Sequence, residues 1–390
     1  MNGDGGVGHA VVDYVSPYVA YLGEQQAVIV RGSGFVGATT VMFGDQPAAS
    51  MQVTSDTEIR AVPPVVNVAG RLSVTVGSTS GRSHADLVVR SHPNYTYASV
   101  ETGVGFQDRH ILYDAERDAV FSYCSWFGNY QASSPSTVNR YAYDRSDGTW
   151  SKTSTYVPSL WDIDMSPDGK YLIALSTSRL WLLDPVTLST LGYADLTQMG
   201  QLGTAGQLGV ANDGKVLIRD LGVAYSLVDK TFTLAKFPGG IGIVFSGDGS
   251  RGVVGDANTS ATVPLSKYDA STGLISPSQT FEYFQLPSMD RTGSHYFSGG
   301  NLRDKDLILV GGVPAFLGYM RPDAKRAYDI DTTNNTHIHV YDLVGNGPSF
   351  PQLADIVVGD ALESFWIRAS LDNKYLFIPG PNKFIVVPLP

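Results

Sequence analysis

The chain has 390 residues, more than one ordinary domain needs and enough for two. Its 37 acidic residues outnumber the 27 basic ones, and the resulting formal charge of −10 would be repelled by phosphate backbones and anionic membranes. Since no run of about 18 apolar residues is present, we expect neither nucleic acid binding nor membrane insertion.

Short alternating apolar runs, 42 glycines and 21 prolines predict an all-β protein from end to end. Residues 11–91 form the first unit. It opens at Ser16-Pro17, continues through Gly32, Gly34 and Phe35 after an apolar run, and reaches Pro63-Pro64 before its last strands. The spacing of these runs, with glycine and proline at the corners, predicts a small sandwich of about seven strands.

These residues resemble the IPT/TIG family of immunoglobulin-like domains. The family's hallmarks are an opening Ser-Pro, a Gly-x-Gly-Phe, a Val-x-Phe-Gly and a later proline, and residues 16–64 contain all four. The resemblance implies a spacer or an interaction module of surface proteins and receptors. A DNA-contacting version needs basic loops, and residues 1–92 hold five arginines and no lysine.

A tight-turn signature recurs about seven times after residue 95. Asp-Gly between two apolar runs is a strong hairpin signal, because a type I′ turn needs positive φ at both central residues. A repeat of roughly 40 to 45 residues with several short strands predicts the blades of a β-propeller, so we expect residues 95–390 to form seven blades. The turns lie at residues 114–118, 166–172, 211–217, 246–251, 290–293, 321–325 and 371–376.

A second mark recurs within the same units. An apolar residue followed by aspartate ends an expected third strand at Asp144, Asp184, Asp229, Asp269 and Asp342. The fifth unit, residues 286–313, lacks it, so six or eight blades are the alternatives to seven. The distance from first turn to this mark varies, so the extra residues must lie in the loops between second and third strands. These loops and the connections between blades share one face of the disc, which we call the long-loop face; the short turns share the opposite, tight-turn face.

The last unit holds only three apolar segments, within residues 365–390. A propeller must be closed or it exposes sheet edges. We therefore predict that residues 95–100 supply the missing outer strand by pairing with residues 384–387. The propeller resembles the YVTN-type and lactonase-type propellers of bacterial and archaeal proteins through its turn motif.

We expect the binding site on the long-loop face, because loops on a rigid scaffold concentrate binding residues. The longest loop carries Trp126, Phe127 and Tyr130, which could stack on a sugar ring or hold an apolar side chain of a protein. Packing over the first blade is the alternative for these three rings. Trp161 and Trp366 precede inner strands and are further ligand-binding candidates, with packing between blades as the alternative.

Acidic residues and histidines offer two further sites. Asp162 and Asp164 share one face of a strand, where they could do acid/base work or bond to backbone amides. Asp329, Asp331, His337 and His339 provide ligand types for a divalent metal such as Zn²⁺ or Mn²⁺. No other cofactor is implied. No Gly-x-Ser-x-Gly elbow or phosphate-binding glycine loop is present, so no catalytic residue is assigned.

The sequence favours a non-enzymatic binding protein that recognises a glycan or a protein, with the first domain as spacer or interaction module. The alternatives are an enzyme of the lactonase, lyase or glycoside hydrolase type at the channel mouth, and an architectural module of a larger surface assembly. Residues 1–6 do not resemble a signal peptide. Because such domains usually lie outside the cell, we expect an extracellular, cell-surface or periplasmic protein whose export signal is not in this sequence.

Overall fold

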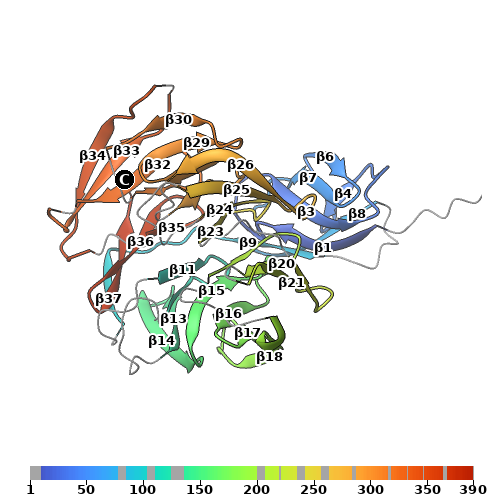
Figure 1. Ribbon diagram of the computed structural model, residues 1–390, viewed down its shortest axis with the longest axis horizontal. Helices are drawn as coiled ribbons and strands as arrows, with labels where there is room; N and C mark the ends of the chain where they lie inside the picture. The colour runs from blue at the N-terminus through green and yellow to red at the C-terminus, as the bar shows by residue number, and fades with distance from the viewer. Residues whose placement is uncertain are drawn as a thin grey trace, which may run out of the picture.

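The computed structural model shows an all-β protein with a sandwich followed by a propeller, as the sequence predicts (Figure 1). Among the described residues the helical segment is the short 3-10 turn Thr197–Met199. The described residues are 10–77, 85–102, 110–123, 136–199, 207–218, 221–234, 242–255, 263–282, 287–314, 318–331, 333–345, 347–362 and 367–389.

The sandwich consists of two sheets, with strand orders β1-β3-β7-β6 and β2-β9-β8-β4-β5. Alternating residues from both sheets form its core, in which Val30, Phe35, Ile59, Val74 and Leu87 are fully buried. Its strands are β1 (Val11–Ser16), β2 (Val19–Tyr21), β3 (Val28–Ser33), β4 (Val41–Phe43), β5 (Gln46–Pro47), β6 (Ser50–Ser55), β7 (Glu58–Val62), β8 (Gly70–Val76) and β9 (Ala85–Arg90).

The described strands that follow form seven four-stranded antiparallel sheets, here called blades 1 to 7. Blades 1 to 3 contain β11 (His110–Asp114), β12 (Ala119–Tyr123), β13 (Thr137–Asp144) and β14 (Thr149–Tyr156); β15 (Leu160–Met165), β16 (Leu172–Ser176), β17 (Arg179–Leu183) and β18 (Thr190–Asp195); β19 (Leu208–Val210), β20 (Lys215–Ile218), β21 (Val223–Ser226) and β22 (Phe232–Leu234). Blades 4 and 5 contain β23 (Gly242–Phe245), β24 (Arg251–Gly255), β25 (Val263–Asp269) and β26 (Leu274–Glu282); β27 (Ser288–Met289), β28 (His295–Ser298), β29 (Asn301–Asp304) and β30 (Leu309–Gly312). Blades 6 and 7 contain β31 (Tyr319–Met320), β32 (Arg326–Ile330), β33 (His337–Asp342) and β34 (Gln352–Val357); β35 (Arg368–Ala369), β36 (Tyr375–Gly380), β37 (Lys383–Pro388) and β10 (Ala98–Glu101).

Blade 7 joins the two ends of the propeller segment, as the sequence predicts. Strand β10 pairs antiparallel with β37, with Ala98 opposite Val386 and Val100 opposite Phe384. Aromatic side chains fill the adjoining interface with blade 1, where the Phe384 ring lies 5.0 Å from that of Tyr141 and 5.3 Å from that of Trp150. The early strand therefore completes the last blade and covers an edge that would otherwise be exposed.

Four of the five recurring aspartates, Asp144, Asp184, Asp269 and Asp342, act as turn residues at the ends of the third strands. In blade 2, for example, the Asp184 carboxylate accepts the backbone N–H of Val186 at 2.8 Å. Blade 5 has the same device at Asp304, which accepts the N–H of Asp306 at 2.9 Å. The preceding residue is Arg303 instead of an apolar residue, which is why the sequence mark is missing there. In blade 3 the third strand ends earlier than expected, at Ser226, whose hydroxyl donates to the Asp229 carboxylate at 2.9 Å.

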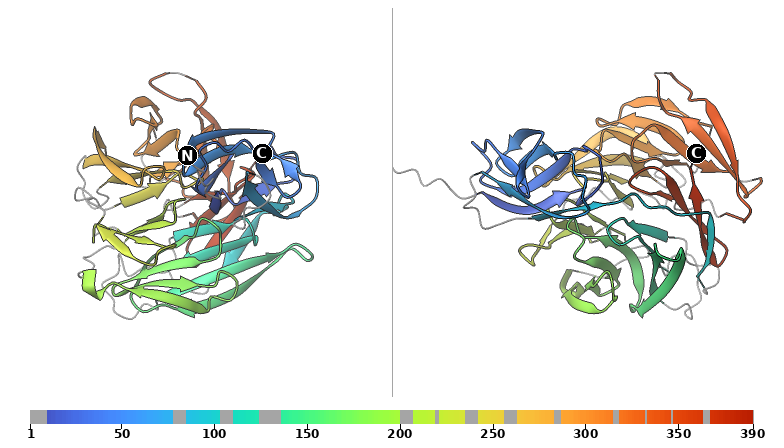
Figure 2. Two further views of the ribbon diagram at one scale, coloured as in Figure 1. Left: turned by 90° about the vertical axis from the view of Figure 1, so that its right-hand side faces the viewer. Right: turned by 180° about the vertical axis from the view of Figure 1, so that it is seen from behind.

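The sandwich lies against one face of the propeller (Figures 1 and 2). Its contacts reach turns between first and second strands, at Asp114 in blade 1 and Asn212 in blade 3, and His92 of the following junction contacts Asp372 in the same turn of blade 7. In antiparallel blades these turns share one face of the disc. The sandwich therefore covers the tight-turn face, opposite the long-loop face.

Two glycines of the repeated turn allow this close approach. Gly214 has φ +76°, and a Cβ there would lie 2.7 Å from the Tyr14 ring. Gly169 has φ +66° and meets the Tyr18 ring in the same way. Glycine meets two requirements of these turns. It adopts the left-handed conformation without strain, and it leaves room for a tyrosine from the sandwich.

A buried polar network crosses the same interface. The Arg31 side chain, 4% exposed, lies 2.7 Å from the Glu58 carboxylate, and its Nε donates to Asn212 Oδ1 at 2.8 Å. Asn212 in turn donates from Nδ2 to the Asp248 carbonyl at 2.7 Å. One sandwich side chain is thereby linked to the turns of blades 3 and 4.

The junction between the two units is also held in place. The buried Asp118 carboxylate accepts hydrogen bonds from Arg90 at 2.6 Å, Arg145 at 2.7 Å and the Tyr95 hydroxyl at 2.9 Å. The Tyr375 hydroxyl donates to the Pro93 carbonyl at 3.2 Å. Strand β9 belongs to the sandwich and β10 to blade 7, so we place the proposed boundary between domains 11–91 and 95–390 between these two strands.

Candidate functional site

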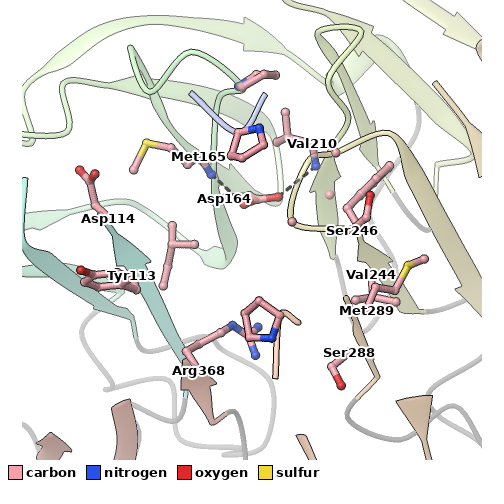
Figure 3. Close-up of a pocket in the computed structure, with 18 of the residues that line it drawn as sticks. Tyr113, Asp114, Asp164, Met165, Val210, Val244, Ser246, Ser288, Met289 and Arg368 are labelled. Atoms are coloured by element: carbon pink, nitrogen blue, oxygen red, sulfur yellow. Dashed lines mark hydrogen bonds between the residues drawn. The ribbon is translucent and has the colours of Figure 1, made fainter. Parts of the chain in front are cut away.

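A cavity of about 370 Å³ occupies the central channel of the propeller (Figure 3). Residues from the inner strand or first turn of every blade line it. The sandwich contributes Ser16, Pro17, Tyr18 and Val19, from the end of β1 to the start of β2. The volume falls within the about 300 to 1,000 Å³ typical of small-molecule sites.

Two carboxyl groups on β15 face this cavity and the neighbouring blade. Asp162 Oδ2 accepts the N–H of Leu208, and Asp164 Oδ2 accepts the N–H of Val210, both at 3.0 Å. Figure 3 shows Asp164 between the backbones of Met165 and Val210. The alternation seen in the sequence thus places both carboxyl groups on one face, where they connect blade 2 to β19 of blade 3.

Burial changes the protonation of both groups. It raises the pKa of Asp162 to about 6 and that of Asp164 to about 7, from an ordinary value of 3.8. Backbone N–H donors counteract part of this shift for each group, and the Tyr123 hydroxyl also donates to Asp162. Near neutral pH, Asp164 is therefore poised between its protonated and ionised forms.

A cation lies across the channel from these acids. Arg368, on β35, points into the cavity opposite Asp164 in Figure 3. Its guanidinium lies 5.9 Å from the centre of the Tyr319 ring, and its charge favours the ionised forms of Asp162 and Asp164. The cavity therefore offers a guanidinium, two carboxyl groups and phenol hydroxyls to a ligand.

A hydroxyl links the inner strands of two other blades. Ser288 Oγ, on β27, accepts the N–H of Met320 on β31 at 2.9 Å. Side chains of Ser288, Asp162 and Asp164 thus satisfy inner-strand amides of the following blade. This structural role is the one that the sequence offered as the alternative for the two aspartates.

Of the five ligand-binding residues expected from the sequence, only Trp161 lies within the described residues. Trp126, Phe127, Tyr130 and Trp366 lie outside the described residues. Trp161 is 4% exposed and packs in the core between blades 2 and 3, the packing position considered as its alternative. It precedes Asp162 on β15, so its neighbour reaches the cavity while the indole supports the blade interface.

The four expected metal ligands lie on β32, β33 and the loop between them, away from the channel cavity. Asp329 is opposite His339 in the strand pair, and His339 Nε2 lies 3.9 Å from Asp331 Oδ2. His337 instead contacts Asp355 of β34, with 2.7 Å between Nδ1 and Oδ2. Among the described residues no group of three or more His, Cys, Asp or Glu side chains is arranged to hold a metal.

Sequence reasoning did not assign Arg368, Tyr319 or the segment Ser16–Val19 to the site. An arginine beside the apolar run 365–367 was the available signal for Arg368. No local signal connects residue 18 to residue 368, because only docking of the sandwich on the propeller brings both to the channel. The site is a product of the arrangement of the two units.

Fold and cavity define a β-propeller whose channel is lined in part by a preceding sandwich. Residues 10–91 match the family model of the IPT/TIG domain, so the sandwich is a TIG domain, as its hallmarks indicated. No curated protein matches the chain. Within the described part of the chain, no helix is long and apolar enough to cross a membrane.

Solved structures that resemble the chain share little sequence with it. An auxiliary nutrient binding protein from Bacteroides ovatus is 12% identical, with a TM-score of 0.43 and 98% of each chain covered. A putative 6-phosphogluconolactonase from Bacteroides uniformis is 15% identical, with a TM-score of 0.48 and coverage of 67% of this chain and 88% of that one. The C-terminal WD40 domain of Sif2 is 11% identical, with a TM-score of 0.45 and coverage of 97% and 99%.

Proposed function

We propose that this is an exported, non-enzymatic binding protein that takes a glycan at the long-loop face, with the terminal sugar entering the channel cavity. The observation that carries the proposal is the cavity itself, where Arg368, Asp162 and Asp164 gather within about 370 Å³. Paired carboxyl and guanidinium groups supply acceptors and donors for several ring hydroxyls at once. The arginine offsets the charge of one acid, and the raised pKa of Asp164 reduces the charge of the other near neutral pH, which favours a neutral polyol over a strongly charged ligand.

Trp126, Phe127 and Tyr130 remain the proposed first contacts of the ligand on the long-loop face. A sugar chain leaving the cavity would pass the long-loop face, where aromatic rings could stack on its second ring. The seven four-stranded sheets support a seven-bladed propeller as the scaffold. In this proposal the face is extracellular, cell-surface or periplasmic; a protein ligand with an apolar side chain is the alternative occupant.

Removing the channel cation tests the proposal. Arg368→Gln should weaken glycan binding by about ten- to a hundred-fold, because a hydrogen bond to a charged group contributes about 1.5 to 3 kcal/mol. A glycan array would identify the ligand, and calorimetric titration would compare the variant with the original protein. Lys305→Gln, which removes an exposed cation on blade 5 outside the cavity lining, is the matched control. If Arg368→Gln and Lys305→Gln bind the glycan with equal affinity, the channel is not the binding site. If only a third variant, Trp126→Ala, loses binding, the site is restricted to the loops.

The acid pair favours one second function, an enzyme of the lactonase, lyase or glycoside hydrolase type. Asp164, with a pKa of about 7, could exchange a proton with a bound substrate near neutral pH. If so, lactones or aryl glycosides would be turned over, and Asp164→Asn would lower kcat by at least about a hundred-fold. Absence of turnover together with retained glycan binding would leave the binding function standing. Failure of both assays would favour the architectural alternative.

A further inference from the structure

We infer that the TIG domain is a fixed stopper, in which Tyr18 closes the tight-turn end of the channel and sets how far a ligand can reach. The inference deepens the proposed function, since it concerns the depth of the proposed ligand site. It also assigns the domain a role other than that of a spacer. The argument rests on three sets of contacts around the same end of the cavity.

Tyr18 is fixed at this end by both its ring and its hydroxyl. The hydroxyl donates to Asp114 Oδ1 at 3.3 Å, in the first turn of blade 1. The ring packs against Gly169, in the corresponding turn of blade 2. Tyr18 thus spans two adjacent blades while lining the cavity, and loss of its ring would leave a gap between them.

An apolar cluster seals the segment that follows. Val19 and Val88 of the TIG domain pack with Ala115 of blade 1, all less than 6% exposed. Leu371, in the first turn of blade 7, packs against the same cluster. This contact excludes water beside Tyr18 and joins the TIG domain to both blades that meet at the ring closure.

A second side chain crosses the same end of the channel from within the propeller. Arg291, in the first turn of blade 5, is 6% exposed and donates from Nη2 to the Leu371 carbonyl in blade 7. It also lines the cavity. Because blade 6 lies between these two blades in chain order, the arginine bridges across it under the TIG domain.

The stopper is fixed because its contacts are distributed around the ring. Arg31 bonds to blade 3, Arg90 to blade 1 and His92 to Asp372 of blade 7, with 3.2 Å between His92 Nδ1 and Oδ2. The junction segment is held by Arg145 and Tyr375. A hinge motion that lifted Tyr18 would have to break these contacts together, so we expect access to the cavity from the long-loop face only.

Thiol labelling tests the stopper in the full chain without a ligand. In a Cys124→Ser background, Met165→Cys places one cysteine on the cavity wall near the tight-turn end. Tyr18→Ala should raise the rate of its reaction with a bulky maleimide at least about ten-fold. Tyr14→Ala is the matched control, because it removes another interface tyrosine, at Gly214, that does not line the cavity.

The outcomes separate the stopper from the binding function. Faster labelling in Tyr18→Ala alone supports the stopper even if no glycan binds. Equal acceleration of labelling in both tyrosine variants would mean that general loosening of the interface opens the channel. No acceleration in either variant would mean that Tyr18 does not close the channel. Either result would overturn the inference. Labelling is measured well below the melting temperature of each variant, so global unfolding does not supply the access.

Discussion

Phe384→Ala should lower the free energy of unfolding of the propeller by about 3 to 5 kcal/mol, the usual range for removing a buried phenylalanine. The ring is 1% exposed and packs against Tyr141 and Trp150 of blade 1. It therefore lies where the last blade meets the first. The space left by the missing ring would weaken both the core of blade 7 and the interface between blades 7 and 1 that closes the propeller.

Urea denaturation followed by tryptophan fluorescence measures this effect, because all five tryptophans lie in the propeller segment, between residues 126 and 366. Leu234→Ala is the control. It also removes a large apolar side chain from a strand, but Leu234 is 82% exposed and the change should cost well under 1 kcal/mol. A similar small cost for Phe384→Ala would show that the closing interface does not limit stability.

The sequence predicted the fold well because propeller repeats are local. Each Asp-Gly turn and each strand-ending aspartate is visible within a few residues, and the three-stranded last unit required a strand from elsewhere. Pairing of β10 with β37 confirmed that argument. The sequence mark was missing in blade 5 because Arg303 precedes its turn aspartate, where the five marked units have an apolar residue.

The site was less predictable because its parts are distant in the chain. Alternation of Asp162 and Asp164 could be read directly, whereas their bonds to Leu208 and Val210 depend on the next blade. Burial then determines their pKa values, and burial depends on how seven blades and a TIG domain assemble. Gly169 illustrates the same limit, because its turn geometry was readable and its contact with Tyr18 was not.

Arg31→Met should reveal how far the TIG domain and the propeller depend on each other. The substitution leaves the Glu58 carboxylate, 12% exposed, without its cation and the Asn212 side-chain oxygen Oδ1 without its donor. Breaking a buried pair in this way costs about 3 to 5 kcal/mol. Part of that cost should appear in the propeller, because Asn212 also supports the turn at Asp248 through its bond to the carbonyl there.

The placement of the tryptophans makes this coupling measurable. Arg31 lies in the TIG domain, whose residues 10–91 contain no tryptophan, so fluorescence reports only on the propeller. We expect the urea midpoint from fluorescence to fall in Arg31→Met. The double variant Arg31→Met with Glu58→Met should recover part of the loss, because a buried pair replaced by apolar side chains of similar volume is often neutral. A lower midpoint for the TIG domain by circular dichroism, with the fluorescence midpoint unchanged, would show that the two domains unfold independently and that Arg31 stabilises only its own sandwich.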